Sequence, residues 1–164
     1  MLKINRQTDY AVRVVLTLSR RKPGARVPTS EIQREMLIPP VLIQRTVAEL
    51  ASGGFINTQA GRDGGITLAY SPSQITLLQI VEHFEGPIYL SDCVIKPEEC
   101  PFSTRCPVTR RWSRLKNAIR AELESTTFEE LVNDALAIES EIRTSASAGP
   151  VTDSVMKDLG LSVE

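Results

Sequence analysis

The chain has 164 residues, of which 41% are hydrophobic and 24% charged, a composition typical of a globular protein and not of a disordered chain. Its longest nearly apolar run, residues 75–81, is far shorter than the roughly 20 residues that cross a bilayer. Arg6, Asp9 and Arg13 interrupt the position where a signal peptide has its apolar core. We therefore expect a cytoplasmic protein with no membrane partner.

Charge is distributed unevenly along the chain, although the net charge is only −1. Residues 1–70 contain ten Lys and Arg against five Asp and Glu, whereas residues 71–164 contain nine against fifteen. A basic half favours an acidic partner, and nucleic acid is the first candidate. A chance scatter of a few charges is the alternative.

Two helices are predicted at the start of the chain. Apolar residues at helical spacing over residues 11–18 indicate a first helix, with Thr8 as its N-cap. A short second helix is expected from residue 29 or 30 to residue 36, where Ser30 and Gln33 have the spacing of a capping box.

A third helix and a hairpin follow. The helix is predicted over residues 40–52, because Pro40 suits a first helical turn and Gly53-Gly54 suits its end. Two β-prone runs, residues 55–58 and 66–70, flank a glycine-rich loop and predict a hairpin. A helix-turn-helix followed by such a hairpin has the order of a winged helix. The predicted fold is mostly α with a small β-hairpin wing (α+β).

The second half is predicted to be helical apart from one segment. A helix over residues 76–85 has a capping box at Thr76 and Gln79. Residues 87–106 have no clear periodicity, and Pro107 then opens a long helix to about residue 124. A last short helix is expected to begin at residue 126 or 127.

We divide the chain into three parts on this basis. Residues 1–70 are the expected winged-helix DNA-binding domain, and residues 71–140 are the expected cysteine loop and dimerisation helices. Residues 141–164 are expected to be a flexible or weakly helical tail, since they begin with a Ser- and Ala-rich run.

The third helix carries side chains suited to reading DNA. Gln44 and Arg45 are residue types that bond adenine and guanine edges bidentately. Ordinary solvated surface residues are the alternative. The candidate DNA-binding residues are Pro40, Val41, Gln44 and Arg45 on this helix, Arg62 at the hairpin tip, and Lys3, Arg6 and Arg26 as phosphate contacts.

The long helix after Pro107 has an apolar stripe of Trp112, Leu115, Ile119 and Leu123. A single winged helix of this size covers only half of a two-fold-related DNA site, so we expect a homodimer on double-stranded DNA. The stripe is the expected dimerisation surface, and packing within one subunit is the alternative.

The three cysteines, Cys93, Cys100 and Cys106, all lie in the aperiodic segment. Clustered thiols in a chain without an export signal favour a metal or redox role over a disulfide framework. Three thiolates would bind a metal or cluster with a fourth ligand from elsewhere. The only histidine, His83, is interpreted as a surface residue of the preceding helix, not as a ligand.

We find no nucleophile–base set, no phosphate-binding loop and no paired carboxylates, and so we do not expect an enzyme or a small-molecule substrate. Taken together, these features resemble one known family, the dimeric winged-helix regulators typified by IscR and NsrR. The resemblance covers about residues 1–135. It rests on Thr8-Asp9-Tyr10-Ala11, residues 38–50, Gly54-Phe55-Ile56, Gly61 with Gly64-Gly65, Ile75-Thr76-Leu77, the three-cysteine loop, Trp112, and Thr127 before Leu131.

The resemblance implies an iron–sulfur cluster held by Cys93, Cys100 and Cys106, with [4Fe–4S] favoured over [2Fe–2S]. IscR-like members supply a histidine three residues after the last cysteine, but this chain has Thr109 there. NsrR-like members supply an aspartate from the first helix of the partner, and Asp9 stands at that position. Asp9 is therefore the expected fourth ligand; an ordinary acidic residue in a first helical turn is the alternative.

Two departures from the family pattern stand out. The first cysteine gap is one residue longer than usual, and Ala60 replaces the arginine that normally precedes the first glycine of the wing. The expected function is a transcription regulator, predicted to be a repressor, whose cluster senses nitric oxide, redox state or iron–sulfur status. The alternatives are a cluster-free thiol-switch repressor and a small metal- or cluster-bearing electron carrier or adaptor.

Overall fold

The structure is a computed structural model, and it describes residues 3–61, 64–102 and 104–147. Contacts between residues divide the chain into one unit that extends through Val132 and a second that begins at Asn133. Across the described residues, no helix combines the length and the apolar character needed to cross a membrane.

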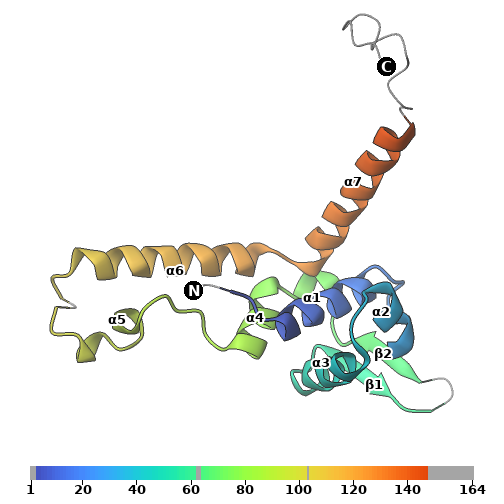
Figure 1. Ribbon diagram of the computed structural model, residues 1–164, viewed down its shortest axis with the longest axis horizontal. Coiled ribbons are helices and arrows are strands. Elements are labelled where there is room, and N and C mark those ends of the chain that lie inside the picture. The colour runs from blue at the N-terminus through green and yellow to red at the C-terminus, as the bar shows by residue number, and fades with distance from the viewer. Residues whose placement is uncertain (1–2, 62–63, 103, 148–164) are drawn as a thin grey trace, which may run out of the picture. The chain divides into compact units, whose positions relative to one another are not determined.

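The first unit begins with a winged helix-turn-helix, which we call the head (residues 3–70; Figure 1). Its strands are antiparallel, with Ile56 opposite Leu68 and Gln59 opposite Gly65. Val27 forms a further bridge with Ile66, which ties the segment before the second helix to the wing. The elements of the head are α1 (Arg6–Ser19), α2 (Thr29–Glu35), α3 (Pro40–Ser52), β1 (Ile56–Gln59) and β2 (Gly65–Leu68).

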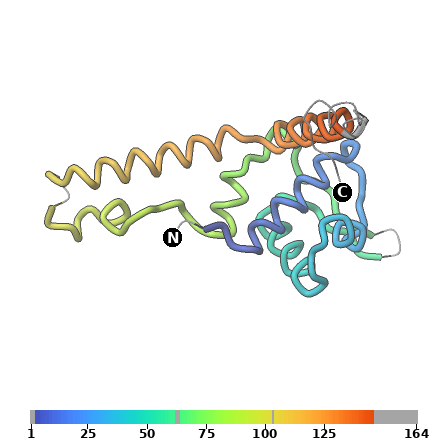
Figure 2. The backbone as a smooth tube through the Cα atoms, turned by 45° about the horizontal axis from the view of Figure 1, so that its top comes forward, coloured from blue at the N-terminus to red at the C-terminus, as the bar shows by residue number. Residues whose placement is uncertain are grey.

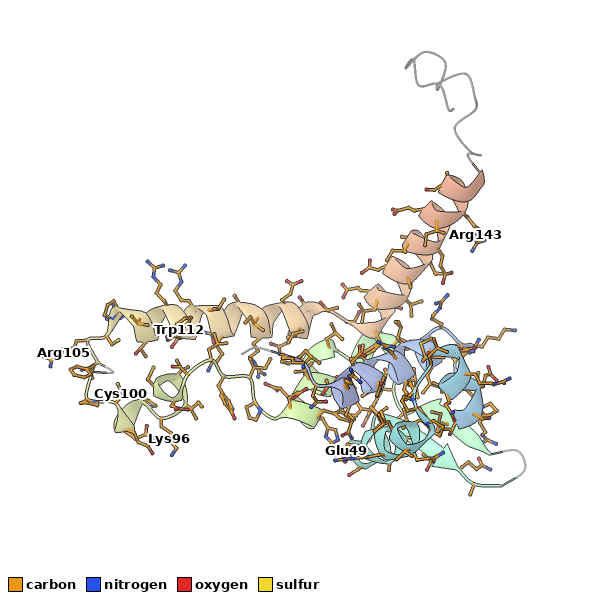
Figure 3. All side chains as sticks on the ribbon, in the orientation of Figure 1. Glu49, Lys96, Cys100, Arg105, Trp112 and Arg143 are labelled. Carbon is orange, nitrogen blue, oxygen red and sulfur yellow. The ribbon has the colours of Figure 1, made fainter. Side chains whose placement is uncertain are left out.

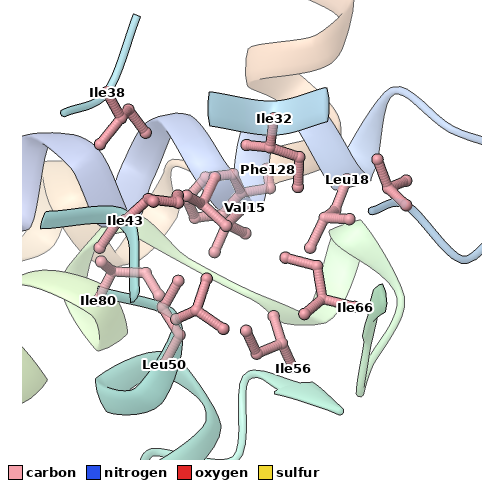
Figure 4. Close-up of a cluster of buried hydrophobic side chains, with 14 of the residues drawn as sticks. Val15, Leu18, Ile32, Ile38, Ile43, Leu50, Ile56, Ile66, Ile80 and Phe128 are labelled. Atoms are coloured by element: carbon pink, nitrogen blue, oxygen red, sulfur yellow. The ribbon is translucent and has the colours of Figure 1, made fainter. Parts of the chain in front are cut away.

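The head surrounds a single apolar core (Figure 4). The aliphatic residues on the inner face of α3, which are Ile43, Val47 and Leu50, are buried there. Phe128, from far along the chain, is fully buried in the same core. Its other buried members are Ala11, Val14, Val15, Leu18, Val27, Ile32, Ile38, Ile56, Ile66, Ile75 and Ile80.

The caps of the first two helices differ from the predictions. The N-cap of α1 is Asn5, whose side chain accepts a hydrogen bond from the backbone N–H of Thr8 at 2.9 Å. Thr8 was the wrong choice because α1 begins at Arg6, before Thr8, and buries the Thr8 side chain. The predicted box of Ser30 and Gln33 is also absent from the described contacts, because α2 begins at Thr29 with Pro28 as its cap.

The turn between α2 and α3 is tight. Leu37 adopts a φ of 51°, a left-handed conformation that is uncommon for a residue with a branched side chain, and its side chain is exposed. Pro40 occupies the first turn of α3, as predicted. At the other end of α3, a Cβ on Gly53 would lie 2.6 Å from the Phe55 ring and 2.8 Å from the His83 ring. A side chain at position 53 would therefore displace one of these two rings.

The helix α4 (Leu77–Glu85) packs against α1, and its predicted capping box is confirmed. Thr76 Oγ1 accepts from the N–H of Gln79 at 3.3 Å, and the Gln79 side chain accepts from the N–H of Thr76 at 3.0 Å. The helix ends at Gly86, whose φ of 80° suits only glycine well. A short 3₁₀ turn, η1 (Pro72–Gln74), connects the wing to this helix.

The remainder of the first unit extends beyond the head (Figures 1 and 2). The short α5 (Asp92–Ile95) and the 3₁₀ turn η2 (Pro97–Glu99) lead to the long α6 (Pro107–Ser125), and α5 contacts α6. At 1.5 Å per residue, α6 is about 28 Å long. Backbone bonds from Leu77 to Thr126 and from Phe128 to Ile75 attach the segment after its C-terminal end to the start of α4.

The last helix is longer than predicted. It was expected to be short, but α7 (Phe128–Ser147) has 20 residues, and its start is capped by Thr127 and Glu130. Residues 141–147, the start of the predicted tail, are therefore helical. The rest of that tail, residues 148–164, lies outside the described residues.

Candidate functional site

The outward face of α3 carries the side chains predicted to read DNA. Pro40, Val41, Gln44 and Arg45 are all exposed, and Val41 has 82% of its surface accessible. They lie opposite the buried Ile43, Val47 and Leu50, so packing on one side of the helix leaves the other side free. This is the arrangement expected of a recognition helix that enters the major groove.

The wing lies beside this face. Gln44 and Ala48 of α3 and Thr58 and Gln59 of β1 line one surface depression of about 340 Å³. The helix and the hairpin therefore form a continuous surface. Arg62, predicted to act at the hairpin tip, lies outside the described residues.

The predicted phosphate contacts lie in two places. Arg26 is exposed beside the wing, next to the bridge between Val27 and Ile66. Lys3 and Arg6 are exposed at the start of α1, and Lys3 lines a depression of about 480 Å³ together with Glu85 and other residues at the end of α4. Arg26 therefore lies close to the candidate DNA-reading face, whereas Lys3 lies where α4 passes into the cysteine segment.

We define the cysteine segment as residues 86–106, between α4 and α6. Cys93 is in α5, Cys100 follows η2, and Cys106 is the N-cap of α6. All three are free thiols of intermediate exposure. Neither α5 nor η2 contains a buried residue, so no apolar core fixes the distances between the three sulfurs.

Thr109, in the first turn of α6, connects two of the cysteines. Its hydroxyl donates a hydrogen bond to Cys93 Sγ across 3.7 Å. The Thr109 side chain and the backbone N–H groups of Thr109 and Val108 also favour the charged form of Cys106, and they hold the pKa of its thiol below the ordinary value. Cys93 Sγ is also 2.8 Å from Ser91 Oγ.

Two of the predicted ligands are not part of this pair. Cys100 directly follows η2, and Asp9 lies on α1, where its carboxylate forms an ion pair with Arg13 at 2.7 Å. Among the described residues, no three or more His, Cys, Asp or Glu side chains are grouped so as to hold a metal ion. Within the described residues, one chain therefore does not assemble the predicted ligand set of Cys93, Cys100, Cys106 and Asp9.

The apolar stripe of α6 is not buried within the chain. Trp112 is 39% exposed and Leu115 is 43% exposed, while Ile119 and Leu123 are half-buried. The described residues of one chain therefore leave the stripe partly exposed, and its role as the dimerisation surface stays a prediction. Figure 3 shows Trp112 on the part of α6 that runs beside α5.

The end of α4 is bonded to the start of α1, a link that the sequence did not reveal. Glu85 Oε1 accepts from Thr8 Oγ1 at 2.6 Å and from the N–H of Asn5 at 2.8 Å. Desolvation is the largest single influence and raises the pKa of Glu85, but the hydrogen bonds from Thr8 and Asn5 outweigh it and hold the pKa below its ordinary value. The only available signal was the helical position of Glu85 just before Gly86-Pro87.

His83 forms a second link, from α4 to α3. Its Nε2 is 3.1 Å from both the backbone oxygen and the carboxylate Oε1 of Glu49. The ring stands edge-on between Phe55 and Phe84, with centroid distances of 5.4 and 5.3 Å. The sequence interpretation made His83 a surface residue of its helix, whereas the structure shows a half-buried residue that joins two helices.

The fold and the exposed face of α3 define a winged-helix, DNA-binding regulator, and comparison with known proteins specifies its family. The Rrf2 family, described as iron-dependent transcriptional regulators, matches residues 4–134. The chain belongs to the Rrf2 family. The predicted resemblance to IscR- and NsrR-type regulators is confirmed, as is the mostly α fold with a β-hairpin wing.

Individual relatives agree with this assignment. NsrR of Bacillus subtilis is 25% identical over 134 residues, covering 81% of this chain and 92% of that protein. A structure of CymR, the global cysteine regulator of B. subtilis, has a TM-score of 0.69 at 25% identity and covers 81% of this chain and 98% of that one. A structure of T. potens IscR shares the fold, with a TM-score of 0.62 at 22% identity over 82% of this chain and 88% of that one. These relatives are transcription regulators, as predicted, and not enzymes.

Proposed function

We propose that this protein is a homodimeric transcription repressor whose DNA affinity depends on an iron–sulfur cluster bound in the cysteine segment. A [4Fe–4S] cluster is favoured. The observation that carries the proposal is the set of three free, partly exposed thiols in a segment with no core of its own, directly after the helix that is bonded to both α1 and α3. DNA binding requires access to the chromosome, so we expect the protein in the cytoplasm.

The donors in this segment suit iron. Thiolates are the usual ligands of iron–sulfur clusters, and none of the three sulfurs is engaged in a disulfide. Their spread within one chain does not argue against binding, because metal sites of this kind are seldom preformed and the binding free energy folds them. Cys93, Cys100 and Cys106 would supply three ligands.

We propose Asp9 of the second copy as the fourth ligand. Its side chain is 47% exposed and forms an ion pair with Arg13 of its own helix, so it is accessible to another chain. The alternative position, Thr109, offers only a hydroxyl, which is a poor ligand for iron. The exposed stripe of Trp112, Leu115, Ile119 and Leu123 supports dimerisation, since a second copy would cover it.

A bound cluster would supply iron that reacts with nitric oxide or oxidants, most readily at the carboxylate ligand, because oxygen matches cluster iron less well than sulfur does. The chain's own residues provide the connection to DNA binding. Glu85 ties the start of the cysteine segment to Thr8, next to Asp9, and His83 ties the same helix to Glu49 near the end of α3. A shift of α4 would therefore move α1 and α3 together.

The DNA contacts follow from the exposed head. We propose that Pro40, Val41, Gln44 and Arg45 approach base edges in the major groove, with Gln44 and Arg45 supplying the bidentate bonds. Arg26, Lys3 and Arg6 would contact phosphates, and Arg62 would act from the wing.

Anaerobic reconstitution of the full chain and of Asp9→Ala tests the ligand set. We expect the wild-type chain to gain iron and visible absorption, and Asp9→Ala to lose cluster stability and to change its reaction with nitric oxide. Asp92→Ala, which alters an exposed carboxylate within the cysteine segment, is the matched control. An Asp9→Ala cluster with an unchanged spectrum and an unchanged response would exclude Asp9 as a ligand.

A cluster-free thiol-switch repressor is the second candidate. The thiol switch is supported by the three partly exposed free thiols and by the likeness to CymR, described as a global cysteine regulator. The family assignment favours both kinds of regulator over an electron carrier or adaptor. Mild oxidation of iron-free protein distinguishes the two: a thiol switch changes DNA affinity reversibly without any bound iron, whereas a cluster sensor responds only after reconstitution.

A further inference from the structure

We infer that Thr109 is a positioning residue whose hydroxyl holds the sulfurs of Cys93 and Cys106 together so that they can share one metal centre. The inference rests on the proposed ligand set and goes beyond it, because Thr109 is not itself a ligand. Its evidence is the contact geometry between the start of α6 and α5.

Thr109 joins Cys93 in α5 to the first turn of α6, whose N-cap residue is Cys106. It lies one helical turn after Cys106, at the third position of α6, while Cys93 lies in α5, sixteen residues before it in the sequence. Its hydroxyl donates to Cys93 Sγ across 3.7 Å, and the side chain is half-buried between the two elements. The bond therefore crosses from one element to another, unlike the contact of Ser91 with Cys93 two residues away.

The hydrogen bond of the Thr109 hydroxyl goes to Cys93. A hydroxyl has a single proton and donates to one acceptor at a time, and Thr109 Oγ1 donates to Cys93 Sγ. Cys106 is the N-cap residue of α6, three residues before Thr109. The bond therefore holds Cys93 at the end of α6 where Cys106 lies, and both thiols remain free to bind a metal.

Hydrogen bonds to ligand sulfurs orient the ligands and tune the metal. The loss of such an outer contact usually lowers metal affinity 10- to 100-fold. We expect this loss for Thr109→Val, which removes the hydroxyl and keeps the shape, and near-normal behaviour for Thr109→Ser, which keeps the hydroxyl. Thr104→Val is the control, since Thr104 is an exposed threonine of the same segment.

The first experiment uses the full chain, purified without oxygen and stripped of metal, so that its result does not depend on a cluster. Dibromobimane becomes fluorescent when it joins two nearby thiols, and peptide mapping then identifies the pair. We expect the wild type, Thr109→Ser and Thr104→Val to give mainly the Cys93–Cys106 product, and Thr109→Val to give several-fold less with an unchanged circular dichroism spectrum. Equal yields from Thr109→Val and the wild type, or a loss in Thr109→Ser as large as in Thr109→Val, would overturn the inference.

The second experiment titrates the same four proteins with Co²⁺ and follows the thiolate-to-metal absorption. We expect Thr109→Val to bind at least tenfold more weakly than the wild type and Thr109→Ser to bind within about threefold. Unchanged Co²⁺ affinity in Thr109→Val contradicts the inference. If even the wild type binds no Co²⁺, the proposed ligand set fails, and the crosslinking result still decides whether Thr109 pairs the two sulfurs.

Discussion

The head and the cysteine segment differ in what holds them together. In the head, aliphatic side chains from α1, α2, α3 and the wing are buried in one core, and Phe128 closes it. The cysteine segment and α6 bury no residue in any of their helices or 3₁₀ turns, although α6 contacts α4 and α5 and Thr109 bonds to Cys93. The head is thus held together by a core of its own chain, whereas the cysteine segment has its thiols but no core to fix their positions.

This difference is suited to a sensor. A site whose ligands are fixed by a core would not change shape when a ligand is lost, but a site held by metal and partner contacts would. Glu85 and His83 connect the less stable region to the stable one, because they bond α4 to α1 and α3. A change in the cysteine segment that moves α4 would therefore also move the head.

The largest expected effect is on the head. Ile43→Ala removes a fully buried side chain from the core and should lower the free energy of unfolding by about 2–5 kcal/mol. Leu115→Ala, on the exposed stripe of α6, is the contrast and should cost far less under conditions where the chain is monomeric. Urea unfolding followed by circular dichroism measures both, and equal losses would remove the distinction between the two regions.

A smaller effect is expected at the DNA-reading face. Arg45→Ala should weaken binding to a selected duplex by about 1–3 kcal/mol, roughly a 5- to 150-fold rise in Kd, and should relax base preference at one position. Arg111→Ala removes an exposed arginine of α6 and serves as the control. Fluorescence anisotropy at fixed salt, on a duplex selected from a random pool, gives the comparison. If the two variants lose affinity equally, α3 is not the reading helix.

The smallest effect concerns the link between the regions. Because the folded-state pKa of Glu85 is lowered, its contribution to stability is fully present above the ordinary glutamate pKa of about 4.3 and is lost as the pH falls through the lowered value. We expect the free energy of unfolding of the wild type to exceed that of Glu85→Gln by about 1 kcal/mol near neutral pH and by almost nothing in strong acid. The difference is small because the carboxylate is exposed to solvent.

Unfolding free energies of the two proteins across this pH range measure the difference. Glu124→Gln, at an exposed carboxylate of α6, is the control and should match the wild type to within about 0.5 kcal/mol at every pH. A gap between the wild type and Glu85→Gln that stays constant with pH would contradict the role given to the charged carboxylate.

The head was predictable from local signals. Apolar spacing located α1 and α3, Pro40 and Gly53 marked the limits of α3, and the glycine-rich loop marked the wing. The errors were also local. Asn5 and Thr8 are both good capping residues, and only the burial of Thr8 against Glu85 decides between them.

The candidate site was predictable in composition but not in contacts. Cysteine spacing identified the thiols, yet nothing local shows that Thr109 lies beside Cys93, because that contact depends on how α5 meets α6. Glu85 bonds to Thr8 across 77 positions of sequence, and His83 bonds to Glu49 across 34 positions. Both links follow from the packing of α4. Long-range pairing of polar groups leaves no periodic signature in a sequence.

The most direct test of the central claim is to measure DNA affinity of the full chain, purified without oxygen, with and without its bound iron. The account predicts a coloured, iron-containing protein whose Kd for a selected duplex changes at least tenfold when the iron is removed and returns on reconstitution. A colourless protein that takes up no iron under reconstitution and binds the duplex with the same Kd throughout would contradict it.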